Sequence, residues 1–350
     1  MKPRHGHAEE TFYNMTLDGR TLETHAGGDI TVYGFFQPPV KSVPTIRGYT
    51  IASEITGDGD LVFKSNGSST WPNGYFAATG LNTNFAGTIR LTMTAGSTSN
   101  ADLTPDDIYA RLDVADGRNL GGPLAEANPK AIWIDNGCML RTTGADISLA
   151  EPTRGVYVGS KARFNVQEGH ALAISSPLAV NGTLVKDGDG ELALGGPLCF
   201  GSDGTATTPT EGKNALTVKA GSVRALSADA FDGLAITFAE GAKLVVDVDA
   251  SDSGLARYGI RNVKAATPFA STATDGMIDV ELDFDGAQEK NLTVGICTVP
   301  TSVAPAVKSM LRLSKPAWRG YTAEVVSAAD GENTVISASV EVKATVLIMR

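Results

Sequence analysis

The stretch from residue 162 to 194 constrains the fold more than any other part of the chain. It contains short runs in which every second residue is apolar, "ARFNV", "HALAI", "PLAVNGTLV" and "GELAL". Glycine or proline separates these runs, at Gly169, Pro177, Gly182, Gly188 and Gly190. Alternation with a period of two gives each short strand one apolar face, and the glycines permit tight turns. This stretch is therefore predicted to be all-β.

The same pattern extends from about residue 28 to residue 247, for example in "GTIRLTM" and "GAKLVVDV". The chain has 39 glycines and only 19% charged residues, which suits many short strands and tight turns better than long surface helices. A sandwich or a barrel would also contain such strands. A pair of inward-facing apolar residues followed by a glycine turn recurs over roughly 80 residues, and this order fits a solenoid better. We predict a parallel β-helix over residues 28–249.

The remaining segments differ from this pattern. Residues 1–27 form a polar N-terminal segment, and two polar, glycine-rich stretches at 64–84 and 197–214 are expected to be inserted loops. Beyond residue 250 the strands are longer, and residues 301–314 carry an amphipathic helical pattern. Because a solenoid needs an end that blocks edge pairing, residues 250–350 are predicted to form a small mixed β/α cap.

Seven residues within the first stretch follow the pattern G-x-L-x-K-x-G-x-G-x-L-x-L: Gly182, Leu184, Lys186, Gly188, Gly190, Leu192 and Leu194. This pattern resembles the autotransporter-associated β-strand repeat, also called the passenger-associated transport repeat. A second, looser copy lies between residues 57 and 93. The resemblance implies a right-handed parallel β-helix on an exported, surface-displayed or secreted bacterial protein. The resemblance by itself does not imply an enzymatic activity.

Part of the same stretch, Gly188–Ala193, also satisfies the G-x-G-x-x-A fingerprint of dinucleotide-binding loops. A nucleotide site would require a helix that begins at this loop, because the helix amides bind the pyrophosphate. The residues that follow, Leu194-Gly195-Gly196-Pro197, cannot sustain a helix. The glycines are therefore interpreted as a turn between two strands, and no cofactor is expected.

The sequence contains no complete catalytic or metal-binding motif, so no catalytic residue and no metal ligand is predicted. His5 and His7 lack further ligands at suitable spacing. A carbohydrate-active enzyme, such as a polysaccharide lyase or hydrolase, remains the alternative. Such enzymes on β-helices assemble their acids from different coils and leave no local signature, and this hypothesis rests on fold analogy alone.

Aromatic residues in the segment "TWPNGYF" are candidates for stacking on sugars, namely Trp71, Tyr75 and Phe76. In the preferred interpretation, these rings fold back over the β-helix. A carbohydrate-binding module is the other alternative function.

Charge and hydropathy restrict the partners. The net charge of −10, with scattered basic residues, argues against nucleic acid, and no apolar run is long enough to span a membrane. The start of the sequence lacks the apolar core of a signal peptide, so extracellular or cell-surface localisation follows from the resemblance alone. We predict a non-enzymatic structural or adhesive stalk whose partners are surface glycans or other cell-surface proteins.

Overall fold

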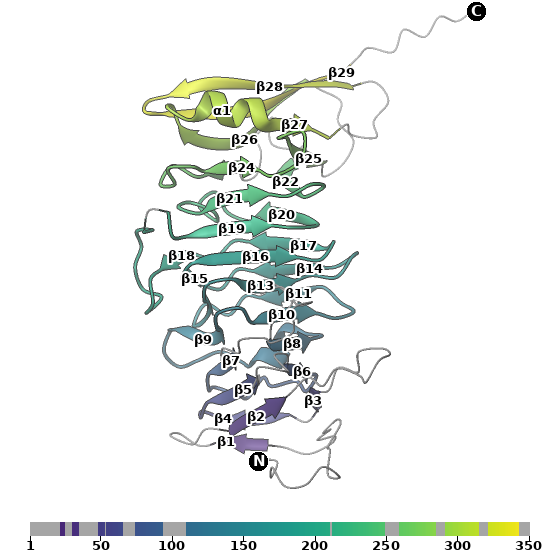
Figure 1. The fold of residues 1–350 in the computed structure, drawn as a ribbon, viewed down its shortest axis with the longest axis vertical. Helices are drawn as coiled ribbons and strands as arrows, with labels where there is room; N and C mark the ends of the chain where they lie inside the picture. The colour runs from purple at the N-terminus through teal and green to yellow at the C-terminus, as the bar shows by residue number, and fades with distance from the viewer. Residues whose placement is uncertain are drawn as a thin grey trace, which may run out of the picture.

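A computed structural model describes ten segments of the chain, residues 22–24, 30–34, 48–52, 54–65, 74–93, 110–210, 212–248, 259–284, 291–314 and 321–342. The described strands stack along one long axis, from β2 near one end to β28 and β29 at the other (Figure 1). Successive strands in each of three sheets pair in parallel. The predicted all-β parallel β-helix is confirmed.

The three sheets form the sides of the β-helix. Sheet 1 contains β3 (Gly48–Ile51), β6 (Gly74–Ala78), β8 (Ala110–Val114), β10 (Met139–Thr142), β13 (Ala162–Asn165), β16 (Thr183–Asp187), β19 (Ala215–Val218), β21 (Ala235–Phe238) and β24 (Phe269–Ser271). Sheet 2 contains β11 (Ile147–Leu149), β14 (Ala171–Ile174), β17 (Glu191–Leu194), β20 (Ser222–Ala225), β22 (Lys243–Val248), β25 (Ile278–Phe284) and β27 (Leu311–Leu313). Sheet 3 contains β2 (Ile30–Gly34), β5 (Leu61–Ser65), β7 (Ile89–Met93), β9 (Asn128–Ile134), β12 (Arg154–Val158), β15 (Leu178–Val180) and β18 (Leu198–Phe200). A short parallel pair, β1 (Leu22–Thr24) with β4 (Ile55–Gly57), lies outside these sheets, and β1 falls within the predicted polar segment 1–27.

The interior is built from apolar residues that occupy the same register in successive coils. In sheet 1, one inward row runs from Phe76 through Leu112 and Leu140 to Phe164, and all four side chains are fully buried. Each inward side chain thus packs between those of the coils before and after it. Burial of an apolar side chain of this size stabilises the fold by roughly 1.5–3 kcal/mol.

The repeat-like stretch forms the strand–turn–strand unit that the glycines predict. β16 ends at Asp187 and β17 begins at Glu191, with a turn and no helix between them. Gly188 has φ +75°, which favours glycine, and a Cβ there would lie 2.2 Å from the carbonyl oxygen of Val166 in the previous coil. The fingerprint of a dinucleotide loop is therefore a strand corner in this chain.

The other matched residues are structural as well. Gly182 has φ +114°, and a Cβ on Gly190 would meet the carbonyl oxygen of Gln167 at 2.2 Å. Leu184, Leu192 and Leu194 are buried in the core. The glycines allow the coils to approach closely, and the leucines fill the space between the sheets.

Lys186 is an unusual member of the inward row, because it is completely buried between Phe164 and Val218 in the sheet register. Its Nζ donates hydrogen bonds to the carbonyl oxygens of Asp187 at 3.0 Å, Gly188 at 2.7 Å and Ala220 at 3.1 Å. Burial lowers its pKa to about 8, since desolvation penalises the ammonium ion, against an opposing effect of nearby carboxylates. Lys186 therefore closes the corner between sheets 1 and 2 with its own hydrogen bonds.

Arg154 performs the same task at another corner. It is 2% exposed, and its guanidinium donates to the carbonyl oxygens of Gly122 at 2.6 Å, Gly87 at 2.9 Å and Phe85 at 2.9 Å. Burial lowers the pKa of Arg154 to about 10, so the guanidinium keeps its charge at neutral pH. One side chain thus donates to three carbonyl oxygens, of which that of Phe85 also accepts from the N–H of Gly122 at 3.1 Å.

Two predicted loops contain strands of the β-helix. β6, within 64–84, pairs with β3 and β8 in sheet 1. β18, within 197–214, pairs with β15, and residues 201–206 fold back so that Phe200 and Ala206 form an antiparallel bridge. Their polar, glycine-rich composition reflects the turns beside these strands, so only parts of each stretch are insertions.

The cap begins later than residue 250. β24 extends sheet 1, and β25 and β27 extend sheet 2, so parallel stacking continues past the predicted boundary as far as Leu313. A four-stranded sheet of β23 (Ile260–Arg261), β26 (Leu292–Pro300), β29 (Asn333–Val342) and β28 (Tyr321–Asp330) lies at this end, and most of its pairing is antiparallel (Figure 1). The helix α1 covers only Ala304–Met310, because residues 311–313 of the predicted helix pair with β25 as β27.

Substitution of Gly188 by alanine tests the close approach of the coils. We expect G188A to lower the free energy of unfolding by roughly 3 kcal/mol, because the new methyl group adds a backbone clash to the strain of positive φ. Gly169 is a matched control, with φ +76° and no atom within 4 Å of the place that a methyl group would take. G169A should lose only about 1 kcal/mol in urea unfolding. Equal losses in the two variants would contradict the close approach.

The buried lysine predicts a pH-dependent stability. Between pH 8 and the ordinary lysine pKa of 10.5, the unfolded chain binds more protons at Lys186 than the folded chain does. The wild type should therefore gain up to about 3 kcal/mol of unfolding free energy relative to K186M as the pH rises through this window. Urea unfolding of both proteins from pH 7 to 11 measures the difference. A difference that does not change with pH would contradict a lowered pKa.

Candidate functional site

A row of polar and aromatic side chains lies on the outer face of sheet 3. In β7, β9 and β12, an outward residue stands between two buried ones, giving Ile89-Arg90-Leu91, Ile132-Trp133-Ile134 and Val156-Tyr157-Val158. The strand register places Arg90 beside Trp133 and Trp133 beside Tyr157. We call these three residues the sheet 3 ladder; adjacent members are one strand spacing apart, about 4.8 Å.

The members of the ladder contact one another through their rings and charges. The Arg90 guanidinium carbon lies 3.9 Å from the centre of the Trp133 ring, a cation–π contact. The Trp133 and Tyr157 rings meet edge to face, with centres 5.5 Å apart and an interplanar angle of 74°. The indole of Trp133 therefore has a neighbour from the strand on each side.

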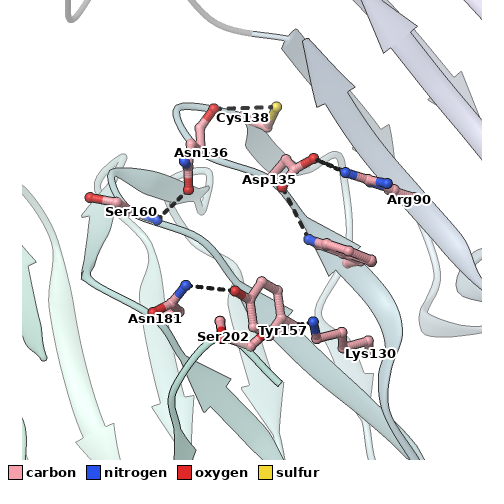
Figure 2. Close-up of polar contacts among 10 residues, drawn as sticks. Arg90, Lys130, Asp135, Asn136, Cys138, Tyr157, Ser160, Asn181 and Ser202 are labelled. Atoms are coloured by element: carbon pink, nitrogen blue, oxygen red, sulfur yellow. Dashed lines mark hydrogen bonds and ion pairs between the residues drawn. The ribbon is translucent and has the colours of Figure 1, made fainter. Parts of the chain in front are cut away.

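Lys130, on the same strand as Trp133, adds a second cation. Its Nζ lies 4.5 Å from the centre of the Trp133 ring and 4.6 Å from that of Tyr157. The same Nζ donates a hydrogen bond to the carbonyl oxygen of Ser202 at 2.5 Å (Figure 2). This contact ties the segment 201–206 to the outer face of sheet 3.

Asp135 and Asn181 fix the polar ends of the ladder. The Asp135 carboxylate accepts hydrogen bonds from Arg90, at 2.7 Å from Nη2, and from Trp133, at 3.1 Å from Nε1. Asn181 donates from Nδ2 to the hydroxyl of Tyr157 at 2.8 Å (Figure 2). Burial raises the pKa of Tyr157, and the hydrogen bond from Asn181 opposes this. Tyr157 is thus a neutral phenol at physiological pH.

The fold-back of segment 201–206 covers Tyr157, which is only 4% exposed. Gly204 lies against the sheet so closely that a Cβ there would be 3.0 Å from Cβ of Ala179 and 3.5 Å from Cδ2 of Tyr157. Its φ of +74° favours glycine as well. Part of the predicted loop 197–214 therefore packs on the sheet 3 ladder.

This arrangement supports packing rather than catalysis. The Asp135 carboxylate is already engaged by a guanidinium and an indole N–H, so it is poorly suited to act as a general base. The nearby thiol of Cys138 is fully buried, and burial raises its pKa, which disfavours the nucleophilic thiolate (Figure 2). Cations and a second ring lie against the indole, which leaves little of its surface for a sugar to stack on.

The structure corrects one of the three predicted sugar-stacking residues, Phe76. Phe76 is fully buried, and its ring centre lies 5.3 Å from that of Phe63 in the core, so it cannot contact a ligand at the surface. The backbone of Tyr75 lies in β6, but its side chain is outside the described part of the structure. Trp71 also lies outside the described residues, so its role stays a prediction.

Trp133, an aromatic residue on the outer face of sheet 3, was not predicted from the sequence. A signal for it exists, because Trp133 stands between Ile132 and Ile134, which predict an outward position by alternation. Its neighbours Arg90 and Tyr157 are 43 and 24 residues away in the chain. Only the register of the coils brings the three together.

Within the described residues, no group of three or more His, Cys, Asp or Glu side chains is arranged to hold a metal ion. The helical part of the same residues includes no segment with the length and hydropathy that a membrane span requires. Comparison with models of known protein families and with curated protein sequences gives no match to the chain.

A double-mutant cycle tests whether the sheet 3 ladder stabilises the β-helix. We expect W133A to lower the free energy of unfolding by roughly 2 kcal/mol and R90A by about 1 kcal/mol. The double variant should lose about 0.5–1 kcal/mol less than the sum, because the two residues share one cation–π contact. Urea unfolding measures all three variants.

R118A is the control for this cycle, because Arg118 pairs with Asp116 at the surface without an aromatic neighbour in the described contacts. Its unfolding midpoint should stay close to that of the wild type. Strict additivity of W133A and R90A would show that the ladder contact contributes nothing.

Proposed function

We propose that the chain is a structural or adhesive shaft of an exported bacterial protein, without enzymatic activity of its own. The observation that carries this proposal is the parallel stacking of successive strands, in sheet 1 from β3 to β24 and in sheet 2 from β11 to β27, around an interior of buried, mostly apolar side chains. Such a stack is extended, and each coil is held by its neighbours through backbone hydrogen bonds. An extended, self-supporting body suits a role that spans distance or displays surfaces.

The repeat-like residues support the exported setting. The seven matched positions from Gly182 to Leu194 form one corner of a coil, as expected for a residue pattern that specifies a β-helix. The pattern resembles a repeat of exported bacterial proteins, and this resemblance is the reason to propose the cell surface or the extracellular medium. Surface glycans or other surface proteins are the proposed partners.

The outer face of sheet 3 favours the non-enzymatic role over the two alternatives. A carbohydrate-active enzyme needs a pair of carboxylates at a set separation, whereas Asp135 is paired with Arg90. A binding module of the stacking type needs an uncovered ring, whereas cations and Tyr157 lie against Trp133. Both observations fit a face that ties coils together.

Protease accessibility on intact cells of the source bacterium tests the proposed location. We expect protease added outside the cells to remove the chain, or the chain to accumulate in the medium, while a cytoplasmic protein of the same cells stays intact. Immunoblots of cells and medium give the measurement. Protection of the chain until the cells are lysed would contradict the exported location.

A separate assay addresses the absence of activity. The purified chain is incubated with a panel of acidic and neutral polysaccharides, and new reducing ends and unsaturated products are measured. Product that increases with the amount of chain would overturn the non-enzymatic proposal and favour the carbohydrate-active alternative.

A further inference from the structure

A cavity of about 360 Å³ lies beside β18, on the opposite side of that strand from β15. Its lining comes from three parts of the chain that are distant in sequence. These are the corner and strand Gly195–Leu198 with Phe200, the segment with Ser227, Asp229 and Asp232, and the pair Arg261 and Lys264. None of these residues belongs to the sheet 3 ladder.

The cavity exists because sheet 3 stops at β18. Sheets 1 and 2 continue with β19 and β20 in the next coil, but the chain after β20 forms turns where a further sheet 3 strand would lie. On the open edge of β18, the N–H of Phe200 donates to the carbonyl oxygen of Ala206 at 2.7 Å. The carbonyl oxygen of Phe200 accepts from the N–H of Ala206 at 3.1 Å. Alternate residues of a strand direct these groups to the same edge, so the N–H and C=O of Leu198 face the cavity side.

Asp232 anchors the charged wall of the cavity. Its side chain is 2% exposed, and Oδ1 accepts hydrogen bonds from the backbone N–H groups of Val263 at 2.9 Å and Lys264 at 3.1 Å. Oδ2 lies 3.1 Å from Nζ of Lys264 and 3.4 Å from Nη1 of Arg261. One buried carboxylate therefore holds two cations, one of which belongs to β23.

The contacts of Arg261 are loose. Its Nη1 lies 3.4 Å from carboxylate oxygens of both Asp229 and Asp232. By comparison, Arg312 contacts two aspartates much more closely, at 2.5 and 2.6 Å and from two different nitrogens. A guanidinium has five N–H donors in a planar fork, and these two contacts share a single nitrogen. Arg261 therefore keeps donor capacity for a ligand.

The remaining lining matches a hydroxylated ligand. Asp229 is 71% exposed and offers acceptor oxygens at the rim, and Ser227 offers a hydroxyl. Pro197 and Leu198 form an apolar wall that suits the C–H face of a ring. The cavity thus combines a bidentate site for an anion with hydroxyl partners and an apolar surface, in a volume at the lower end for small-molecule sites.

We propose that this cavity binds one acidic sugar residue, a six-membered ring that carries a carboxylate. The carboxylate pairs with Arg261 and Lys264, the hydroxyls bond to Asp229, Ser227 and the backbone of Leu198, and the ring lies on Pro197. This binding does not depend on where the protein is located or on its role as a shaft. Its failure in solution would leave the proposed function untouched.

Binding of glucuronate to the purified full chain tests the proposal. We expect a dissociation constant on the order of 1 mM by calorimetry or ligand-observed NMR at low salt. Glucose, which lacks the carboxylate, and acetate, which lacks the ring, should each bind roughly tenfold more weakly or worse. R261A should weaken glucuronate binding by at least about tenfold.

R312A is the matched control, because Arg312 is 48% exposed against 47% for Arg261 and also contacts two aspartates. It should bind glucuronate like the wild type. K264A gives a second test in case R261A loses its fold, which circular dichroism and urea unfolding would show. Any of three results would overturn the proposal: no glucuronate binding, equal binding of glucose or acetate, or unchanged binding in both R261A and K264A.

Discussion

Hydrogen bonds between parallel strands of successive coils are the interaction on which the rest of this structure depends. A single coil has no partner for its strands and cannot bury its inward apolar side chains by itself. The coil that contains β16 and β17 is held on one side by β13 and β14 and on the other by β19 and β20. This pairing fixes the register, and the register decides which side chains meet inside and outside the shaft.

The same constraint explains the polar residues in the interior. Strands satisfy their backbone groups along the axis, but at the corners the chain turns and some carbonyl oxygens lose that partner. Arg154 and Lys186 each donate to three carbonyl oxygens at corners from within the shaft. Asn82 and Asn119 are also buried and bond to backbone carbonyls. Nδ2 of Asn82 donates to the carbonyl oxygen of Asn119, and Nδ2 of Asn119 donates to that of Gly80.

Local pattern was sufficient to predict the architecture where strands and corners follow one another closely. The turn between β16 and β17 could be predicted from Gly188 and the alternating leucines. A positive φ favours glycine, and an inward position favours an apolar residue such as leucine. β6 was missed because its neighbours are polar and glycine-rich, although Phe76 and Ala78 alternate inward. Pattern over a few residues does not show that a short run has strand partners far away in the chain.

The outer surface was harder to predict for a related reason. The outward position of Trp133 follows from its apolar neighbours, but the identity of the residues beside it depends on the number of residues in each coil. Segments of irregular length separate β7, β9 and β12, so the sequence spacing of Arg90, Trp133 and Tyr157 gives no hint that they adjoin. The cavity beside β18 depends on the path of the chain after β20, which no residue pattern records.

The end of sheet 3 at β18 also has a mechanical consequence. From β11 to β18, three parallel sheets share any load that bends the shaft. In the next coil, residues 226–233 form turns on the third side, and only sheets 1 and 2 link the coils there, from β16 to β19 and from β17 to β20. A third parallel pairing follows with β23 and β26. Bending stiffness therefore falls on one side of the shaft at this level.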